Sequence, residues 1–311
     1  MKIKKVLTSP SSFGQINQKP FDIIKENGFE VINNPFGRKL TENEVIELAS
    51  DCVGIVAGVE SLSPYVMDAL PLLKCISRVG VGMDNVDLEY AKHKGIIVVN
   101  TPNGPTRGVA ELTLAMTMSL LRRIPQADSA LKKRKWEKQM GNLILDKQIG
   151  VIGLGRIGKM VSELFRGIGN PVIAFDIYPD EQWANDKGVK LRSFDEVICE
   201  SDILTLHIPG NKDNKAIIGD EEIQKMKSEA FIINISRGGV VDEDALYHAL
   251  ITKKLAGAAI DVFSREPYDG PLCDLDNIIM TPHLGSYAKE DKVKMEIDAV
   301  NNLMKVLKNK L

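Results

Sequence analysis

Short runs of apolar, mostly β-branched residues alternate with amphipathic stretches along the chain. Runs of this length are typical of buried strands, and the amphipathic stretches between them are typical of helices that cover a sheet. In the first hundred residues the pattern predicts strands at 4–7, 30–32, 54–57, 75–77 and 96–99, with helices such as 21–27, 42–49 and 65–69 between them. This alternation predicts a parallel α/β sheet.

A second series of the same kind follows a long apolar helix predicted at 108–123 and ended by Pro125. Its strands are predicted at 148–153, 172–176, 203–206, 231–235, 258–261 and 278–280, and one more helix is predicted at 289–308. Six strands in this span are the complement of a full dinucleotide-binding sheet.

The order of the two series predicts how the domains are organised. A half-size α/β lobe precedes the dinucleotide-binding series, and only one helix follows it. We therefore expect a Rossmann domain at 101–285, inserted into a smaller lobe that is formed by 1–100 and completed by 286–311. Two crossings of this kind would form a hinge, with the active site in the cleft between the lobes.

Composition narrows the class of protein. The 311 residues are 44% hydrophobic and 26% charged, with a net charge of −2, which argues against nucleic acid or an anionic membrane as a partner. The four cysteines are scattered without a C-x-x-C pair, which fits a reducing compartment and no zinc or other metal site. The start of the chain is not typical of a signal peptide, and no apolar run is long enough to span a membrane. We expect a cytoplasmic protein.

The segment QIGVIGLGRIGKM carries a glycine fingerprint between a predicted strand and a predicted helix. Gly153 permits a tight turn, Gly155 lets the backbone approach a pyrophosphate, and Gly158 allows close packing of helix and strand. The pyrophosphate would then bind backbone N–H groups at the positive end of the helix. The alternative is a glycine-rich turn that binds nothing.

The next predicted strand ends in Asp176, eighteen residues after Gly158. A carboxylate at this place can accept hydrogen bonds from the adenosine ribose and would repel a 2′-phosphate. Ile177 and Tyr178 follow, where an NADP enzyme would favour arginine, so we expect NAD as the cofactor. His207 ends the third predicted strand of this series, just before Pro209, and both are expected near the cofactor.

Three later strands are each followed by a polar side chain suited to catalysis. Arg237, Glu266 and His283 lie in the segments NISRGGVVDEDAL, AIDVFSREP and TPHLGS. Ligands bind at the carboxyl ends of strands in open α/β sheets. Hydride transfer at a carbon that bears oxygen needs a histidine to move the hydroxyl proton and a carboxylate to orient that ring and favour its charged form. It also needs an arginine to hold a substrate carboxylate. Alone, each of the three is also typical of a surface loop.

Together, the motifs of the chain resemble those of D-2-hydroxyacid dehydrogenases of the phosphoglycerate dehydrogenase-like group. The resemblance covers about 53–286 and includes SRVGVGMDNVDL, NTPNGPTRGVAELTLAMTMSLLRR, GVIGLGRIG, TLHIP, NISRGGVVDEDAL, AIDVFSREP and TPHLGS. It implies a Rossmann NAD-binding domain inserted into a flavodoxin-like α/β substrate domain. It also implies an NAD-dependent oxidoreductase acting on a small D-2-hydroxy acid, with D-3-phosphoglycerate as the leading substrate.

The resemblance assigns roles to individual positions. It implies that Arg237 binds substrate, Glu266 orients the acid/base and His283 is the acid/base. The Val79, Gly80 and Val81 turn would offer backbone amides to the substrate carboxylate. Apart from the resemblance, Arg78 is a candidate to bind the phosphate of a substrate. The positions expected to touch NAD are Arg156, Ile157, Asp176, Ile235, Asp261 and Ser286. A homodimer is implied through the long helical segment at 110–136.

Two departures from the family pattern keep other substrates open. Phosphoglycerate dehydrogenases commonly carry an Arg-Ser pair where this chain has Ala57 and Gly58, and many relatives have asparagine in place of Pro105. The alternatives are a hydroxypyruvate or glyoxylate reductase, another D-2-hydroxyacid dehydrogenase and a phosphite dehydrogenase. An NAD-sensing corepressor-like protein is a rival from another class. Formate dehydrogenases of this fold typically carry glutamine in place of Glu266, which argues against formate as the substrate. The chain ends at Leu311, so we expect no serine-binding regulatory domain.

Overall fold

The computed structural model describes residues 3–210 and 215–310. Within these residues the chain divides into two compact units. The first unit runs up to Pro105 and resumes at Ser286, and the second unit is Thr106–Gly285. Each unit has a parallel sheet of its own, which confirms the predicted α/β fold class.

In the first unit, the described residues form a five-stranded sheet in the order β2-β1-β3-β4-β5, with every pair of neighbours parallel. The strands are β1 (Lys5–Thr8), β2 (Glu30–Asn33), β3 (Cys52–Ala57), β4 (Cys75–Arg78) and β5 (Ile97–Val99). The helices are α1 (Lys19–Glu26), α2 (Glu42–Ala49), α3 (Pro64–Ala69), α4 (Leu88–His93) and α12 (Lys289–Lys310).

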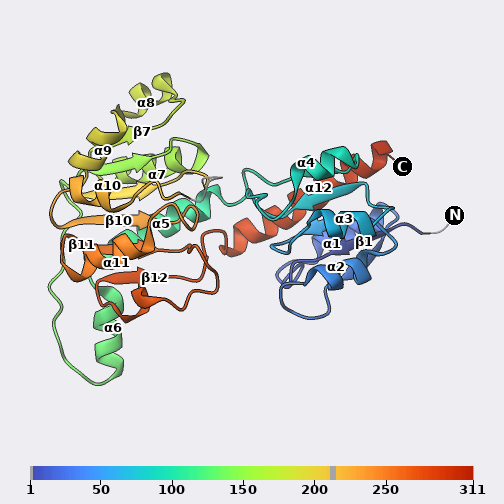
Figure 1. The fold of residues 1–311 in the computed structure, drawn as a ribbon, viewed down its shortest axis with the longest axis horizontal. Coiled ribbons are helices and arrows are strands. Elements are labelled where there is room, and N and C mark those ends of the chain that lie inside the picture. The colour runs from blue at the N-terminus through green and yellow to red at the C-terminus, as the bar shows by residue number, and fades with distance from the viewer. Residues whose placement is uncertain (1–2, 211–214, 311) are drawn as a thin grey trace. The chain divides into compact units, whose positions relative to one another are not determined.

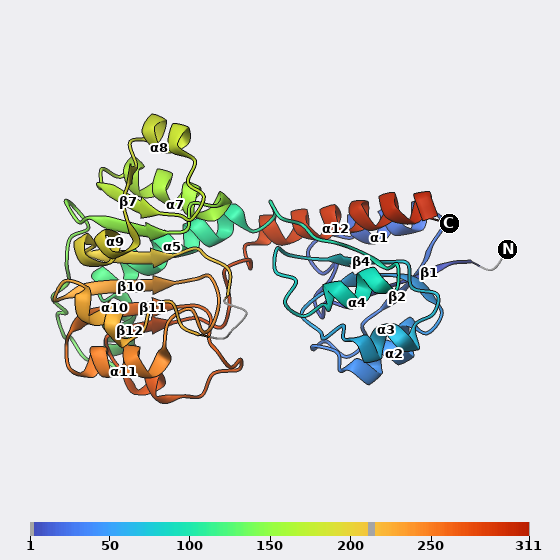
Figure 2. The same ribbon diagram turned by 45° about the horizontal axis from the view of Figure 1, so that its top comes forward.

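The helices of the first unit cover both faces of its sheet. Helices α1 and α12 lie side by side on one face, while α2, α3 and α4 lie on the other (Figures 1 and 2). Strand β3 is buried along its whole length, because it lies in the middle of this sandwich. On the α12 face Gly54 leaves room for Leu303, since a Cβ built at this glycine would lie only 3.0 Å from a Leu303 methyl carbon.

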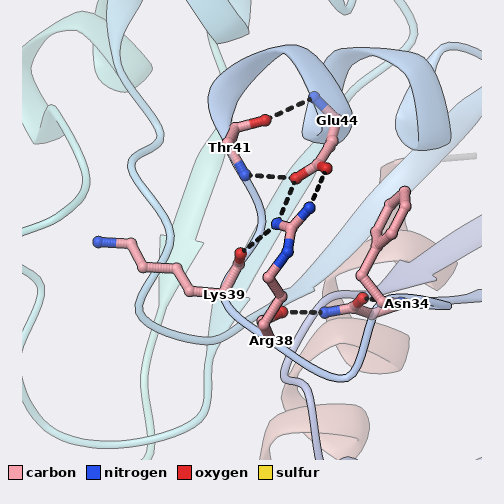
Figure 3. Close-up of polar contacts among 6 residues, drawn as sticks. Asn34, Arg38, Lys39, Thr41 and Glu44 are labelled. Atoms are coloured by element: carbon pink, nitrogen blue, oxygen red, sulfur yellow. Dashed lines mark hydrogen bonds and ion pairs between the residues drawn. The ribbon is translucent and has the colours of Figure 1, made fainter.

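A closed polar cluster fixes the loop from β2 to α2 (Figure 3). Thr41 and Glu44 form a capping box at the start of α2, and the Arg38 guanidinium binds both Glu44 carboxylate oxygens at 2.6 and 2.9 Å. Arg38 holds the pKa of the Glu44 carboxyl down at about 2. Asn34 closes the loop by donating to the backbone oxygens of Ser9 and Arg38. The loop is therefore built by its own side chains.

In the second unit, the sheet formed by the described residues has the order β12-β11-β10-β9-β6-β7-β8, again all parallel. The strands are β6 (Ile149–Ile152), β7 (Val172–Phe175), β8 (Lys190–Leu191), β9 (Ile203–Leu206), β10 (Ala230–Asn234), β11 (Leu255–Ile260) and β12 (Ile278–Met280). The helices are α5 (Thr106–Leu121), α6 (Ile124–Lys132), α7 (Arg156–Gly167), α8 (Glu181–Lys187), α9 (Phe194–Glu200), α10 (Asp220–Lys225) and α11 (Glu243–Ile251), with a short 3₁₀ helix at Pro271–Asp274.

Strand β8 was not predicted, so β9 is the fourth strand of this series and not the third. At two residues, β8 is too short to show an alternating pattern. With β8 included, the order read from β8 to β12 is 3-2-1-4-5-6-7, which is the doubly wound Rossmann order with one additional strand. The reversal of strand order lies between β6 and β9, and ligands bind at such a point in open α/β sheets.

The helices of the second unit also form two layers. Helices α5, α7 and α8 pack on one face of the sheet, and α9, α10 and α11 pack on the other (Figure 2). The long apolar helix spans Thr106–Leu121, so it begins and ends two residues before the predicted 108–123, and Pro125 does not end the helical segment. Pro125 instead lies in the first turn of α6, where proline is well tolerated. Among residues 3–210 and 215–310, no helix is both long and apolar enough to cross a membrane.

Candidate active site

The glycine fingerprint forms the turn between β6 and α7. Gly153 has a φ of +94°, and a Cβ built on it would lie 2.5 Å from the His207 backbone oxygen. A Cβ on Gly158 would lie 1.8 Å from the Gly153 backbone oxygen. The first and third glycines are therefore required by backbone contacts within the turn itself.

The second glycine has a different environment. Gly155 is the N-cap of α7, and no side chain among the described residues caps the helix there. A Cβ built on Gly155 would meet no described atom within 4 Å, so the space beside the N-terminus of α7 is open. Open backbone N–H groups at a helix N-terminus fit a pyrophosphate.

Asp176 directly follows β7 and is tied to the fingerprint turn. Its Oδ2 accepts a hydrogen bond from the Leu154 backbone nitrogen at 2.6 Å, and its Oδ1 accepts one from the Tyr178 nitrogen at 2.8 Å. Each carboxylate oxygen can accept a second hydrogen bond, so the carboxylate can still bind ribose hydroxyls. The residues present thus fit the adenosine part of a dinucleotide.

His207 follows β9, on the other side of the fingerprint turn. Burial lowers the pKa of its imidazole to about 3, so the ring is neutral. Its Nε2 lies 2.9 Å from Thr205 Oγ1, while its buried Nδ1 has no hydrogen-bond partner among the described residues. An unsatisfied buried nitrogen beside a phosphate turn is suited to a ligand. Pro209 lies two residues further on and is exposed.

Arg237 lies in a turn after β10 that is held by Asn234. The Asn234 side chain is buried, accepts hydrogen bonds from the Ser236 nitrogen and hydroxyl, and donates to the Arg237 backbone oxygen. The Arg237 guanidinium donates to the Ser236 backbone oxygen at 2.7 Å. Sequence reasoning missed Asn234, although its place at the strand end in NISR could have indicated it.

Glu266 and His283 form the closest catalytic contact. His283 Nδ1 lies 2.9 Å from Glu266 Oε2, and the other carboxylate oxygen accepts a hydrogen bond from the Phe263 nitrogen at 3.1 Å. Because the side chains of His283 and Glu266 are 50% and 39% exposed, their pair is open to a ligand from solvent. Glu266 and His283 follow β11 and β12, which neighbour each other in the sheet, and Arg237 follows β10 beside them.

The loops that carry Arg237 and Glu266 are packed against each other. A Cβ built on Gly238 would lie 1.9 Å from the Phe263 backbone oxygen, so only glycine allows this approach. All three candidate catalytic side chains thus lie at the carboxyl edge of one sheet, the edge that also carries the fingerprint turn.

Four of the other expected cofactor contacts also belong to the second unit: Arg156, Ile157, Ile235 and Asp261. Arg156 and Ile157 begin α7, and Ile235 is buried directly after β10. Asp261 is fully buried after β11, and its oxygens accept hydrogen bonds from Thr281, Leu284 and Gly285. Ser286, which is also an expected cofactor contact, belongs to the first unit.

The expected substrate turn of the first unit follows β4, and two of its three amides are already used. The Val79 nitrogen donates to the Ala57 backbone oxygen at 2.9 Å, and the Gly80 nitrogen donates to Thr101 Oγ1 at 2.8 Å. The expectation that this turn offers backbone amides to a substrate is therefore limited to the amide of Val81. Arg78 curls back and donates to the Val79 backbone oxygen.

Comparison with known proteins places these features in a family. Residues 114–285 match the model of the D-isomer specific 2-hydroxyacid dehydrogenase NAD binding domain, which is more than half of the chain. A D-3-phosphoglycerate dehydrogenase from Archaeoglobus fulgidus is 36% identical over 298 residues, covering 94% of this chain and 56% of that protein. The chain spans about half the length of the relatives of this name that it matches.

Solved structures match over nearly the whole chain. The TT0316 protein from Thermus thermophilus aligns with a TM-score of 0.89 and 31% identity, covering 98% of this chain and 97% of that one. The D-lactate dehydrogenase from Aquifex aeolicus, solved with NAD and lactic acid, aligns with a TM-score of 0.83 and 29% identity, covering 98% and 96%. The chain therefore belongs to the D-isomer specific 2-hydroxyacid dehydrogenase family, with its NAD-binding domain in the second unit.

Proposed function

We propose that this protein is an NAD-dependent D-2-hydroxyacid dehydrogenase that interconverts a D-2-hydroxy acid and its 2-oxo acid. The observation that carries the proposal is the pairing of His283 with Glu266 at 2.9 Å, next to the strand end that carries Arg237. An acid/base, its orienting carboxylate and a carboxylate-binding guanidinium are the groups that this reaction requires from the protein.

Each residue has a distinct role in the proposed mechanism. Because Nδ1 of His283 faces Glu266, its Nε2 is left to give a proton to the carbonyl oxygen of a 2-oxo acid, or to take one from the hydroxyl of a 2-hydroxy acid. Arg237 binds the substrate carboxylate and polarises the adjacent carbonyl. A bound nicotinamide supplies the hydride donor or acceptor. In the first unit, Arg78 and the backbone amide of Val81 are proposed to bind substrate.

A corepressor-like NAD sensor is the rival from another class. A sensor needs the dinucleotide site but has no use for an acid/base pair, so the Glu266–His283 contact favours an enzyme. Oxidation of NADH with a panel of small 2-oxo acids, run beside NAD reduction with phosphite, separates the dehydrogenases from the sensor. No turnover with any member of either assay would favour the sensor.

We predict that Asp176 selects NAD over NADP. Replacing Asp176 with alanine should narrow the NADH-to-NADPH preference in kcat/KM by about tenfold or more, because the loss of its charge removes the repulsion of a 2′-phosphate and the bonds to ribose. The measurement is kcat/KM for both cofactors. Asp186→Asn, on exposed α8, is the matched control for the loss of one surface charge. Equal use of both cofactors by the native protein would contradict this role.

The leading substrate pair is 3-phosphohydroxypyruvate and D-3-phosphoglycerate, as the names of several relatives suggest. The first unit gives a reason to test it. At the end of β3, where the resemblance to phosphoglycerate dehydrogenases implies an arginine, the chain has Ala57 and then Gly58. The buried Glu60 carboxylate accepts a hydrogen bond from the Gly58 nitrogen at 2.9 Å. The loop therefore presents the Glu60 carboxylate, and not a cation that could bind a phosphate.

If phosphate is recognised, kcat/KM for 3-phosphohydroxypyruvate should exceed that for hydroxypyruvate by at least about tenfold, the equivalent of one charge-assisted contact. The advantage should shrink as ionic strength rises, because exposed ion pairs are screened. Equal or better turnover of hydroxypyruvate, glyoxylate or pyruvate would instead indicate a general D-2-hydroxyacid dehydrogenase.

We also propose a cytoplasmic homodimer that uses the helical segment at 110–136. This segment and the residues directly after it include highly exposed large apolar side chains, among them Trp136 at 83% and Met140 at 90%. Apolar surface of this kind is typical of a protein–protein interface.

A further inference from the structure

The turn that carries His283 holds a strained backbone. His283 has a φ of +55°, in the left-handed region that residues with a Cβ rarely adopt. Such a conformation is unfavourable for a residue other than glycine, and it persists only where neighbouring contacts fix it. Other groups must therefore hold this turn, because the Glu266 contact reaches only the imidazole ring.

Three backbone amides of this turn donate hydrogen bonds to three different oxygens of Asp261. The His283 nitrogen donates to the Asp261 backbone oxygen at 2.9 Å, and the Leu284 nitrogen donates to Oδ1 at 2.6 Å. The Gly285 nitrogen donates to Oδ2 at 2.8 Å. The turn is thus wrapped around one fully buried carboxylate at the end of β11.

Thr281 supplies a further hydrogen bond to the same carboxylate. Its hydroxyl donates to Asp261 Oδ1 at 2.5 Å, and it lies 3.6 Å from the sulfur of Met116 on α5. Burial raises the pKa of the Asp261 carboxyl, while the hydrogen bonds from Thr281 and the two amides oppose that rise. The Thr281 hydroxyl therefore helps to keep Asp261 an acceptor for the whole turn.

We propose that Thr281 is a positioning residue for His283: its hydroxyl orients the Asp261 carboxylate, which fixes the left-handed turn and so holds the imidazole against Glu266. The kinetic consequence rests on the proposed function, whereas the placement of the ring does not. The competing account is that Asp261 serves a bound cofactor only. In that case, loss of the Thr281 hydroxyl would weaken NADH binding and leave the ring in place.

The test compares three variants. Thr281→Val removes the hydroxyl at nearly constant shape, and Thr281→Ser keeps it. Thr117→Val is the matched control, because Thr117 is also buried in the second unit but its hydroxyl donates to the Thr113 backbone oxygen within α5. All measurements are made at a temperature where circular dichroism shows each variant to be folded.

The first readout needs no substrate. The chain has four histidines, so ¹⁵N NMR resolves few imidazoles, and loss of a signal in His283→Gln assigns the one of interest. In Thr281→Val we expect the ¹⁵N chemical shift of His283 Nδ1 to change. It should move away from the value typical of an imidazole N–H that is hydrogen-bonded to a carboxylate. The signal should stay in place in Thr281→Ser and Thr117→Val. An unmoved signal in Thr281→Val overturns the proposal, even if the protein proves to have no dehydrogenase activity.

The second readout is kinetic. For Thr281→Val we expect kcat to fall about tenfold, the equivalent of one hydrogen bond, while the Kd for NADH from fluorescence titration stays within about twofold. Thr281→Ser should restore kcat to within about twofold of the native value. A weaker NADH Kd with unchanged kcat at saturating cofactor would support the cofactor-only account and overturn the proposal, as would an equal fall of kcat in Thr281→Ser.

Discussion

Replacing His283 with alanine is expected to lower kcat for 2-oxo acid reduction by roughly 10²–10⁴-fold, the usual contribution of a general acid or base. The reason is geometric: with Nδ1 held 2.9 Å from Glu266, Nε2 of His283 is the ring nitrogen left to face a substrate. The affinity for NADH should change little, because the dinucleotide fingerprint follows β6, which β9, β10 and β11 separate from the strand before His283. Stopped-flow turnover and fluorescence titration measure the two quantities separately.

The matched control is His248→Ala, on the exposed surface of α11 in the same unit. It removes an imidazole without touching the sheet edge, so its kcat should equal that of the native protein. Unchanged turnover in His283→Ala would remove His283 from the mechanism. A loss of NADH affinity as large as the loss of turnover would instead make the ring a part of the cofactor site.

The sequence alone predicted the placement of the three candidate catalytic residues, because strand ends are easy to locate in this fold. Arg237, Glu266 and His283 each follow a run of apolar residues long enough to identify a buried strand, and parallel strands bring their carboxyl ends to one edge. The same reasoning placed Asp176 directly after β7. The strand pattern alone did not predict the contact between Glu266 and His283, because two exposed loops determine it. It was the resemblance to the family that implied that Glu266 orients His283.

The residues that sequence reasoning missed are those whose role depends on short backbone contacts. Asn234 and Thr281 look like ordinary polar residues beside strands, and only the hydrogen bonds that they make identify them as supports for the loops. For a related reason, the sequence could not show that the Val79 and Gly80 amides make hydrogen bonds within the first unit. Whether a backbone amide is free depends on which acceptor the fold brings beside it, here Ala57 and Thr101.

A series of glycine-to-alanine changes around α7 should separate folding of the fingerprint turn from cofactor binding. Gly158→Ala places a Cβ 1.8 Å from the Gly153 backbone oxygen, and backbone cannot move aside at low cost. Overpacking of this kind costs roughly 1–3 kcal/mol. We expect a fall in Tm of several degrees together with a loss of NADH affinity.

Gly155→Ala should behave differently, because its added Cβ meets no described atom within 4 Å. The fold should be unaffected, and Tm should stay within about a degree of the native value. If the pyrophosphate approaches the backbone at the N-terminus of α7, however, that methyl group occupies its path. The Kd for NADH should then rise on the order of 100-fold, which is about 2.7 kcal/mol.

Gly167→Ala is the control within the same helix. Its Cβ also meets no described atom within 4 Å, but it lies at the far end of α7 from the turn. Alanine favours the helix over glycine by up to about 1 kcal/mol, so Tm should hold or rise while the Kd for NADH stays the same. Native-like NADH affinity in Gly155→Ala would show that the pyrophosphate does not bind at this helix end. An unchanged Tm in Gly158→Ala would show that the turn can relax around the extra methyl group.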